Sequence, residues 1–179
     1  MAQDRTDAQR SSTASRTAAL ADTHFIPRQY EPNYAYPLLV LLHGKGADEE
    51  QLIRAMPALS RRNYVGLGLR GPHPTYKRDR ATGYSWGPDF ELPERSSFRT
   101  EPTASEVERF RSAFGEPEQD SVTRLEDGVF SSIRGIRSLL HVHSERIFLV
   151  GCGEGAAAAY RLGLSFPERF AGVVAINGW

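Results

Sequence analysis

Short apolar runs alternate with amphipathic segments along most of the chain. The apolar runs lack the polar alternation of half-exposed strands and are typical of strands buried in a parallel sheet; they are residues 38–42, 63–69, 146–150 and 170–176. Helical spacing and stop signals predict helices at residues 48–59, shortened by Pro57, and at 121–140 and 155–164. This alternation predicts an α/β fold with a mostly parallel sheet and helices on both faces.

Two segments depart from this alternation. Residues 1–22 are rich in Arg, Ser, Thr and Ala, with no apolar run long enough for a signal peptide or a membrane span. We interpret them as a disordered polar tail; a transit peptide is the alternative, although Asp4, Asp7 and Asp22 disfavour it because such peptides are poor in acidic residues. Residues 75–119 carry charges, Pro and Gly throughout and predict a long excursion over the sheet edge, where sites often form.

Composition limits the function classes further. The 179 residues are enough for one domain, and 22 basic residues balance 22 acidic ones. A formal net charge of zero favours a small neutral ligand over nucleic acid or an anionic membrane. Cys152 is the one cysteine, so no internal disulfide can form, and the five histidines have no zinc-binding spacing with it. The sequence therefore predicts no metal site and favours a cytoplasmic location.

A glycine-rich turn follows the first strong apolar run, at His43-Gly44-Lys45-Gly46. Backbone N–H groups in such a turn can point into the crevice at the carboxyl ends of the strands, where an oxyanion or a phosphate would be held. A plain strand-to-helix turn capped by Asp48 is the alternative for this motif taken alone.

A second glycine turn has the pattern of a nucleophile elbow. The run 147–150 is followed by Gly151-Cys152-Gly153-Glu154-Gly155 and then by alanines. An elbow has the form small-x-nucleophile-x-small, because its central residue lies in a strained, very tight strand-to-helix turn. Gly151 and Gly155 supply the small flanks, but the central Gly153 has no side chain to act as a nucleophile.

In their order, these motifs resemble the carboxylesterase/phospholipase branch of the α/β-hydrolase superfamily, which includes acyl-protein-thioesterase-like members. The matching segments span about residues 35–179 and are 38–48, 83–87, 125–128, 146–155 and 167–175. The resemblance implies hydrolysis of esters, thioesters or lysophospholipids without a cofactor, and a small acyl or ester ligand. It also implies that Lys45 and Glu154 occupy oxyanion positions through their backbone N–H groups, beside His43 and Gly44, and that Trp86 borders the acyl pocket.

The departures from the family pattern concern its catalytic triad. The family has serine where this chain has Gly153, and usually glutamine at Glu154. Its acid and histidine follow the elbow, whereas the residues after Gly153 contain neither aspartate nor histidine. We therefore expect residues 23–179 to form an incomplete α/β-hydrolase-like domain that lacks the C-terminal strands and is catalytically impaired or inactive. The last strand would then have an exposed edge that is expected to pair with another chain.

Two other residues are weighed as nucleophiles of a weakly active esterase. Ser85 lies in Gly83-x-Ser-x-Gly87, with His141 and His143 as conceivable bases, but no strand is predicted before it and Pro88 instead of a helix follows. Cys152 would need small residues two positions away on each side, where the chain has Val and Glu. A buried structural role is the simpler interpretation of this cysteine.

The second turn also fits another function class. Gly151-x-Gly153-x-x-Ala156 after a strand matches the dinucleotide-binding fingerprint, in which a missing side chain lets the backbone approach a pyrophosphate. Against this alternative, Glu154 would place a negative charge beside the phosphates, and the next strand ends at Asn177 instead of an acid for the ribose.

Overall fold

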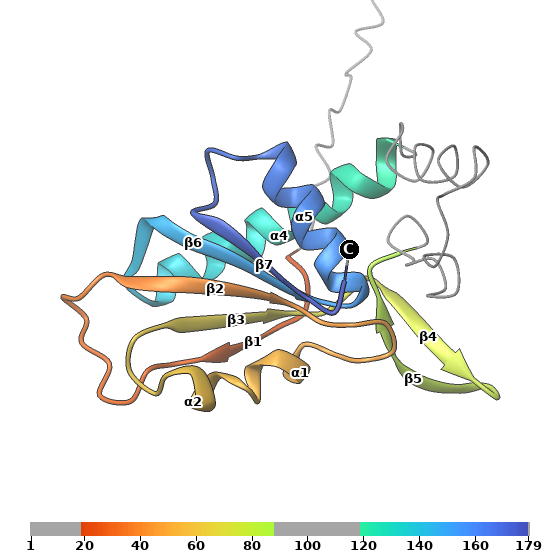
Figure 1. The fold of residues 1–179 in the computed structure, drawn as a ribbon, viewed down its shortest axis with the longest axis horizontal. Coiled ribbons are helices and arrows are strands. Elements are labelled where there is room, and N and C mark those ends of the chain that lie inside the picture. Colours follow the sequence, from red (N-terminus) through yellow and green to blue (C-terminus); the bar gives the residue numbers. More distant parts are fainter. Residues whose placement is uncertain (1–18, 88–118, 179) are drawn as a thin grey trace, which may run out of the picture.

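A computed structural model describes residues 19–87 and 119–178 of the chain (Figure 1). Their centre is a five-stranded sheet with the strand order β1-β3-β2-β6-β7. The strands are β1 (Asp22–Phe25), β2 (Tyr36–Leu42), β3 (Val65–Leu69), β6 (Val142–Cys152) and β7 (Gly172–Ile176). Strand β1 is antiparallel to β3, and the other neighbouring pairs are parallel. The expected α/β fold with a mostly parallel sheet is confirmed.

Strand β2 lies at the centre because both of its faces are apolar. Alternate side chains of a strand point to opposite faces, and those of β2 enter two separate clusters. Leu38, Val40 and Leu42 belong to the larger cluster, whereas Leu39 and Leu41 pack with Met56 in the smaller one. A continuous apolar run is therefore what this position in the sheet requires.

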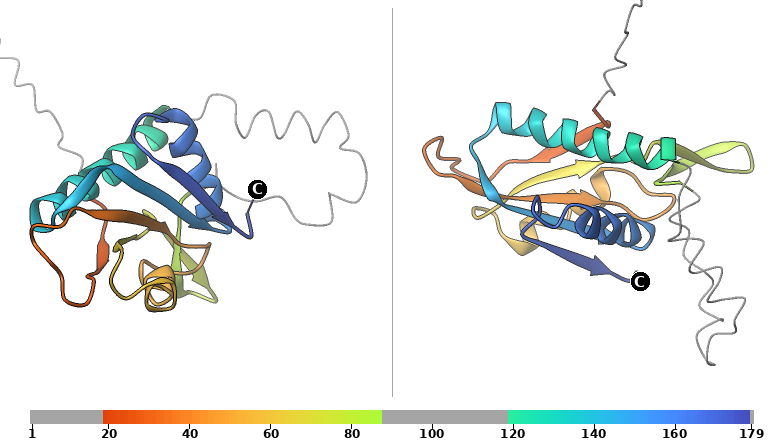
Figure 2. Two further views of the ribbon diagram at one scale, coloured as in Figure 1. Left: turned by 60° about the vertical axis from the view of Figure 1, so that its left-hand side comes forward. Right: turned by 90° about the horizontal axis from the view of Figure 1, so that it is seen from above.

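Helices cover both faces of the sheet, as Figure 2 shows. On one face lie α4 (Gln119–Leu139) and α5 (Glu154–Ser165), and on the other α1 (Glu50–Ile53) and α2 (Met56–Leu59). The helix expected at 48–59 is thus two short helices, with Pro57 in the first turn of α2, where its missing N–H costs nothing. None of the described helices is both long and apolar enough to cross a bilayer.

Glycines in β3 allow the short helices to pack closely. A Cβ atom on Gly68 would collide with the backbone carbonyl oxygen of Glu49, just before α1, and one on Gly66 would press on Met56 and Phe25. The two glycines of β3 therefore serve the packing of α1 and α2 against the sheet.

Part of the expected excursion is a hairpin. Strands β4 (His73–Lys77) and β5 (Arg80–Ser85) pair in an antiparallel way outside the main sheet, and Arg78 and Asp79 at their turn have positive φ angles of 49° and 62°. Two positive φ angles are what a two-residue hairpin turn requires. The expectation that no strand precedes Ser85 is wrong, because β5 ends at this residue. The rest of the excursion, residues 88–118, lies outside the described residues.

Strand β1 was not anticipated. Residues 1–18 of the expected tail lie outside the described residues, but its last residues are described: Leu20 packs against the larger core cluster and Asp22 begins β1. Four residues are too short for a clear periodic signal, and β1 exists through its pairing with β3. Strand β6 also begins earlier than expected, at Val142.

Candidate functional site

The turn between β6 and α5 has the geometry of a nucleophile elbow. Strand β6 ends at Cys152, helix α5 begins at Glu154, and Gly153 between them has φ 56° and ψ −119°. Its N–H donates to the carbonyl oxygen of Ile176 at 2.9 Å, and its own carbonyl accepts from the N–H of Ala156 at 3.0 Å. The tight strand-to-helix turn expected from the sequence is therefore present, with a residue of positive φ at its centre.

The flanking glycines are required by close backbone approach. A Cβ atom on Gly151 would fall on the carbonyl group of Gly155, and one on Gly155 would fall on the carbonyl oxygens of Leu42 and His43. At Gly153 the situation is the opposite, since the nearest atom to a Cβ there is Gly44 Cα at 3.8 Å. The central position thus has room for a side chain that would face the first glycine turn.

The two glycine turns lie side by side. A Cβ atom on Gly44 would lie 3.5 Å from the carbonyl oxygen of Cys152. The first turn is closed by a hydrogen bond of 3.1 Å from Ala47 N–H to Gly44 O, and Gln51 Oε1 accepts from Gly44 N–H at 2.8 Å. Lys45 is exposed within this turn.

His43 is a buried anchor of the first turn. It is 1% exposed, and its Nε2 accepts a 2.9 Å hydrogen bond from the backbone N–H of Gly71. Because Nε2 must accept, the proton of the neutral ring is on Nδ1, which donates to Gly44 O at 2.8 Å. Burial lowers the pKa of His43, against the opposing effect of the bond to Gly44. Both ring nitrogens hold backbone groups, so His43 positions the turn.

Trp86 supports the same turn from the hairpin side. Its indole Nε1 donates to the carbonyl oxygen of His43 at 2.8 Å, and the two rings lie 5.1 Å apart. With 2% of its surface exposed, Trp86 is among the largest buried side chains of the described residues. The side chain that the resemblance assigned to the acyl pocket therefore contacts His43 within the larger core cluster.

Glu154 ties the elbow to the hairpin. This carboxylate is 3% exposed; its Oε1 accepts from Ser85 Oγ at 2.7 Å and its Oε2 from Trp86 N–H at 3.2 Å. Ser85 Oγ in turn accepts from Gly87 N–H at 3.1 Å. A carboxylate beside an oxyanion position would disfavour negative charge there, but both oxygens of Glu154 bind donors at the end of β5.

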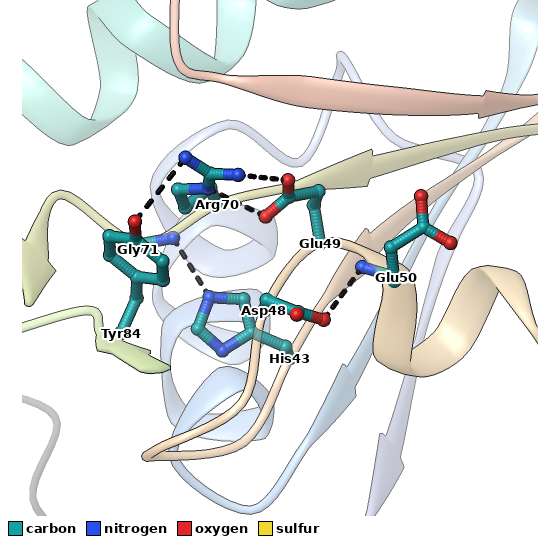
Figure 3. Close-up of polar contacts among 7 residues, drawn as sticks. All are labelled: His43, Asp48, Glu49, Glu50, Arg70, Gly71 and Tyr84. Atoms are coloured by element: carbon teal, nitrogen blue, oxygen red, sulfur yellow. Dashed lines mark hydrogen bonds and ion pairs between the residues drawn. The ribbon is translucent and has the colours of Figure 1, made fainter. Parts of the chain in front are cut away.

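A second polar cluster adjoins His43, as Figure 3 shows. Arg70, just after β3, donates two hydrogen bonds to the Glu49 carboxylate, including one of 2.7 Å from Nε to Oε2. Its guanidinium also lies 4.6 Å from the centre of the Tyr84 ring. The bond with Arg70 lowers the pKa of Glu49, and the same bond raises the pKa of Arg70. No local sequence pattern marks this cluster, since its residues belong to three separate segments.

Comparison of the sequence with known protein families identifies the family of this chain. A profile described as Phospholipase/Carboxylesterase matches residues 29–179, which is most of the chain and includes both glycine turns. The chain belongs to the phospholipase/carboxylesterase family. No curated protein sequence gives a significant match.

Solved structures of two esterases have a fold similar to that of this chain. Esterase PE8 is 22% identical with a TM-score of 0.57; the match covers 90% of this chain and 65% of that one. The carboxylesterase of Bacillus cereus is 16% identical with a TM-score of 0.55, covering 89% of this chain and 60% of that one. At these identities the similarity shows the fold, and the chain spans less than two thirds of either structure. No comparison points to dinucleotide binding.

The alternative nucleophiles Ser85 and Cys152 lie in different surroundings. Ser85 is 7% exposed and already bonded to Glu154 and Gly87. Cys152 is partly buried at the last position of β6, beside the centre of the elbow. His141 and His143 lie at the other end of β6, where their Nδ1 atoms contact backbone groups. The structure therefore does not bring these histidines to Ser85.

Metal chemistry finds no support in the described residues. Within residues 19–87 and 119–178, no three His, Cys, Asp or Glu side chains are grouped so that they could hold an ion.

Proposed function

We propose that this member of the phospholipase/carboxylesterase family binds an acyl or ester ligand at its elbow and lacks ordinary serine-hydrolase activity. The observation that carries the proposal is Gly153, which has φ 56° at the centre of the elbow and no side chain. The scaffold that would present a nucleophile is kept, and the nucleophile itself is missing. An ester carbonyl held there would find no hydroxyl or thiol at the central position.

The size of the expected catalytic loss can be taken from another enzyme that uses a catalytic triad. In a well-studied serine protease, removing the nucleophile alone costs about a million-fold in turnover, and the remaining rate comes from oxyanion stabilisation and binding. We expect the same order of loss here. The remaining interaction would be with the ligand's carbonyl oxygen, through the oxyanion positions that the family resemblance assigns to Lys45 and Glu154.

Three features support binding at this place. Gly153 leaves space on the side that faces Gly44. His43 and Trp86 fix the first turn from within the core, so that its backbone is held in one conformation. Glu154 uses both carboxylate oxygens on the hairpin, and so its charge is partly compensated by donors. A preorganised turn of this kind binds a carbonyl group at little cost in conformational entropy.

The test has a hydrolysis arm and a binding arm. Purified protein is assayed with p-nitrophenyl butyrate and, separately, by equilibrium dialysis with radiolabelled octanoate, with Gly153→Leu as a variant whose side chain fills the space that faces Gly44. We expect no enzymatic hydrolysis and saturable octanoate uptake that the variant loses. Hydrolysis at a rate typical of esterases, abolished by Ser85→Ala or by Cys152→Ala, would overturn the proposal, as would absence of octanoate uptake.

A further inference from the structure

A cavity of about 500 Å³ lies at the end of the sheet opposite to the elbow. Six residues line it, and they come from two short segments: Arg28, Gln29, Ser60, Arg61, Arg62 and Asn63. The first segment follows β1 and the second precedes β3. Since β3 runs parallel to β2, its beginning lies at the edge where β2 also begins, away from the turn after Leu42 (Figure 1).

All the charged residues that line this cavity are basic. Three of the six lining residues are arginines and none is acidic. Within the described part of the chain, none of these guanidinium groups forms an ion pair with a carboxylate. In a chain whose 22 basic and 22 acidic residues balance, this is a local excess of positive charge. Three exposed arginines gathered around one open cavity attract anions.

The walls of the cavity are held together by hydrogen bonds. Arg28 N–H donates to the carbonyl oxygen of Arg61 at 2.7 Å and so joins the two segments. Arg62 Nη2 donates to Gln29 Oε1, which holds this guanidinium beside the other wall. Ser60 Oγ accepts from the N–H groups of Arg62 and Asn63 at 3.2 Å and 3.1 Å. The lining is thus built on the ends of two paired strands, which limits its movement.

We propose that this cavity binds a phosphate group, at a site separate from the elbow. A guanidinium presents its N–H donors in a planar fork that matches the oxygens of phosphate, and several forks around one cavity satisfy a doubly charged anion better than a single lysine would. Asn63, which also lines the cavity, carries an amide that can act as a neutral donor. The ligand class is a small phosphorylated molecule or a phospholipid headgroup, which share this chemistry.

Calorimetric titration with inorganic phosphate at constant ionic strength tests the proposal. We expect saturable binding at one site, weakened about tenfold or more in Arg61→Ala/Arg62→Ala, because two charge-assisted bonds are lost. Arg78→Ala/Arg80→Ala is the charge-matched control on the exposed hairpin turn and should bind as the parent does. Arg28→Ala keeps the backbone bond to Arg61 and should also weaken binding, so the result does not depend on one variant folding.

A second arm separates the two sources of phosphate. Phosphatidylcholine vesicles with and without phosphatidate are sedimented with the parent and with the Arg61→Ala/Arg62→Ala variant. Retention that needs both phosphatidate and the two arginines assigns the site to a lipid headgroup, and no retention assigns it to a soluble ligand. The proposal is overturned by the absence of saturable phosphate binding in the parent chain, or by an equal loss of binding in the hairpin control.

Discussion

Ser85 Oγ donates a 2.7 Å hydrogen bond to Glu154 Oε1 across a separation of 69 residues in sequence. Both groups are buried, and Glu154 also receives the N–H of Trp86. The bond fixes the first residue of α5 to the end of β5, so the hairpin and the elbow are positioned by one pair of side chains.

This pair should be energetically coupled. Glu154→Ala leaves two buried donors without an acceptor and should lower the free energy of unfolding by about 2–4 kcal/mol, whereas Ser85→Ala should cost about 1–3 kcal/mol. In a double-mutant cycle followed by urea unfolding, the double variant should lose less than the sum, with a coupling of about 1–2 kcal/mol. Glu154→Gln, which keeps the size and one carbonyl acceptor, is the control and should be milder. Additive losses would contradict the role given to this bond.

His43 should make stability depend on pH. Its pKa is lowered in the folded protein from 6.5, so below pH 6.5 the unfolded chain binds a proton more readily than the folded one. The stabilisation is therefore complete above pH 6.5 and is lost as pH falls from there through the lowered folded pKa. The expected slope is up to about 1.4 kcal/mol per pH unit. Urea unfolding of the parent and of His43→Gln measures it.

The His43→Gln variant is expected to be less stable than the parent at neutral pH. Its free energy of unfolding should also change less between about pH 5 and pH 7, because glutamine does not titrate. An unchanged slope in His43→Gln would show that another group is responsible.

The three glycines of the elbow should differ in their tolerance of a side chain. Gly151→Ala and Gly155→Ala place a Cβ atom on backbone carbonyl groups and should cost more than about 3 kcal/mol. Gly153→Ala has room, so its cost should be only the backbone strain of a non-glycine residue at positive φ, about 1–3 kcal/mol. Thermal and urea unfolding rank the three variants. A Gly153→Ala variant that is less stable than the other two would refute this geometry.

The outer edge of β7 should mediate self-association. Among the described strands β7 pairs only with β6, and Val174 and Ile176 are 49% and 44% exposed. An apolar strand with an open edge is a template for pairing with another chain. Sedimentation velocity should show concentration-dependent association that Val174→Lys weakens. Leu59→Lys, at an exposed apolar residue of α2, is the control and should leave association unchanged; equal effects of both lysines would count against pairing at this edge.

Local patterns in the sequence were enough for the parallel strands of the sheet and for the elbow. The run 38–42 is apolar at every position because β2 is buried on both faces, and the glycines at 151 and 155 are needed for backbone contacts that any elbow makes. Helix boundaries were predicted less well, since two short helices replace the one expected before β3. Pro57 indicates in the sequence that a long helix is interrupted here. The lengths of α1 and α2, however, depend on their packing against Gly66 and Gly68.

By itself, the sequence determined that the central position of the elbow carries no side chain, because that position is Gly153. Only the tertiary structure decided what the neighbouring polar residues do. His43 anchors a turn and Glu154 binds the hairpin, because each meets partners that are distant in sequence. Hydrophobic periodicity specifies which segments are buried, whereas the partner of a buried polar group depends on how those segments pack.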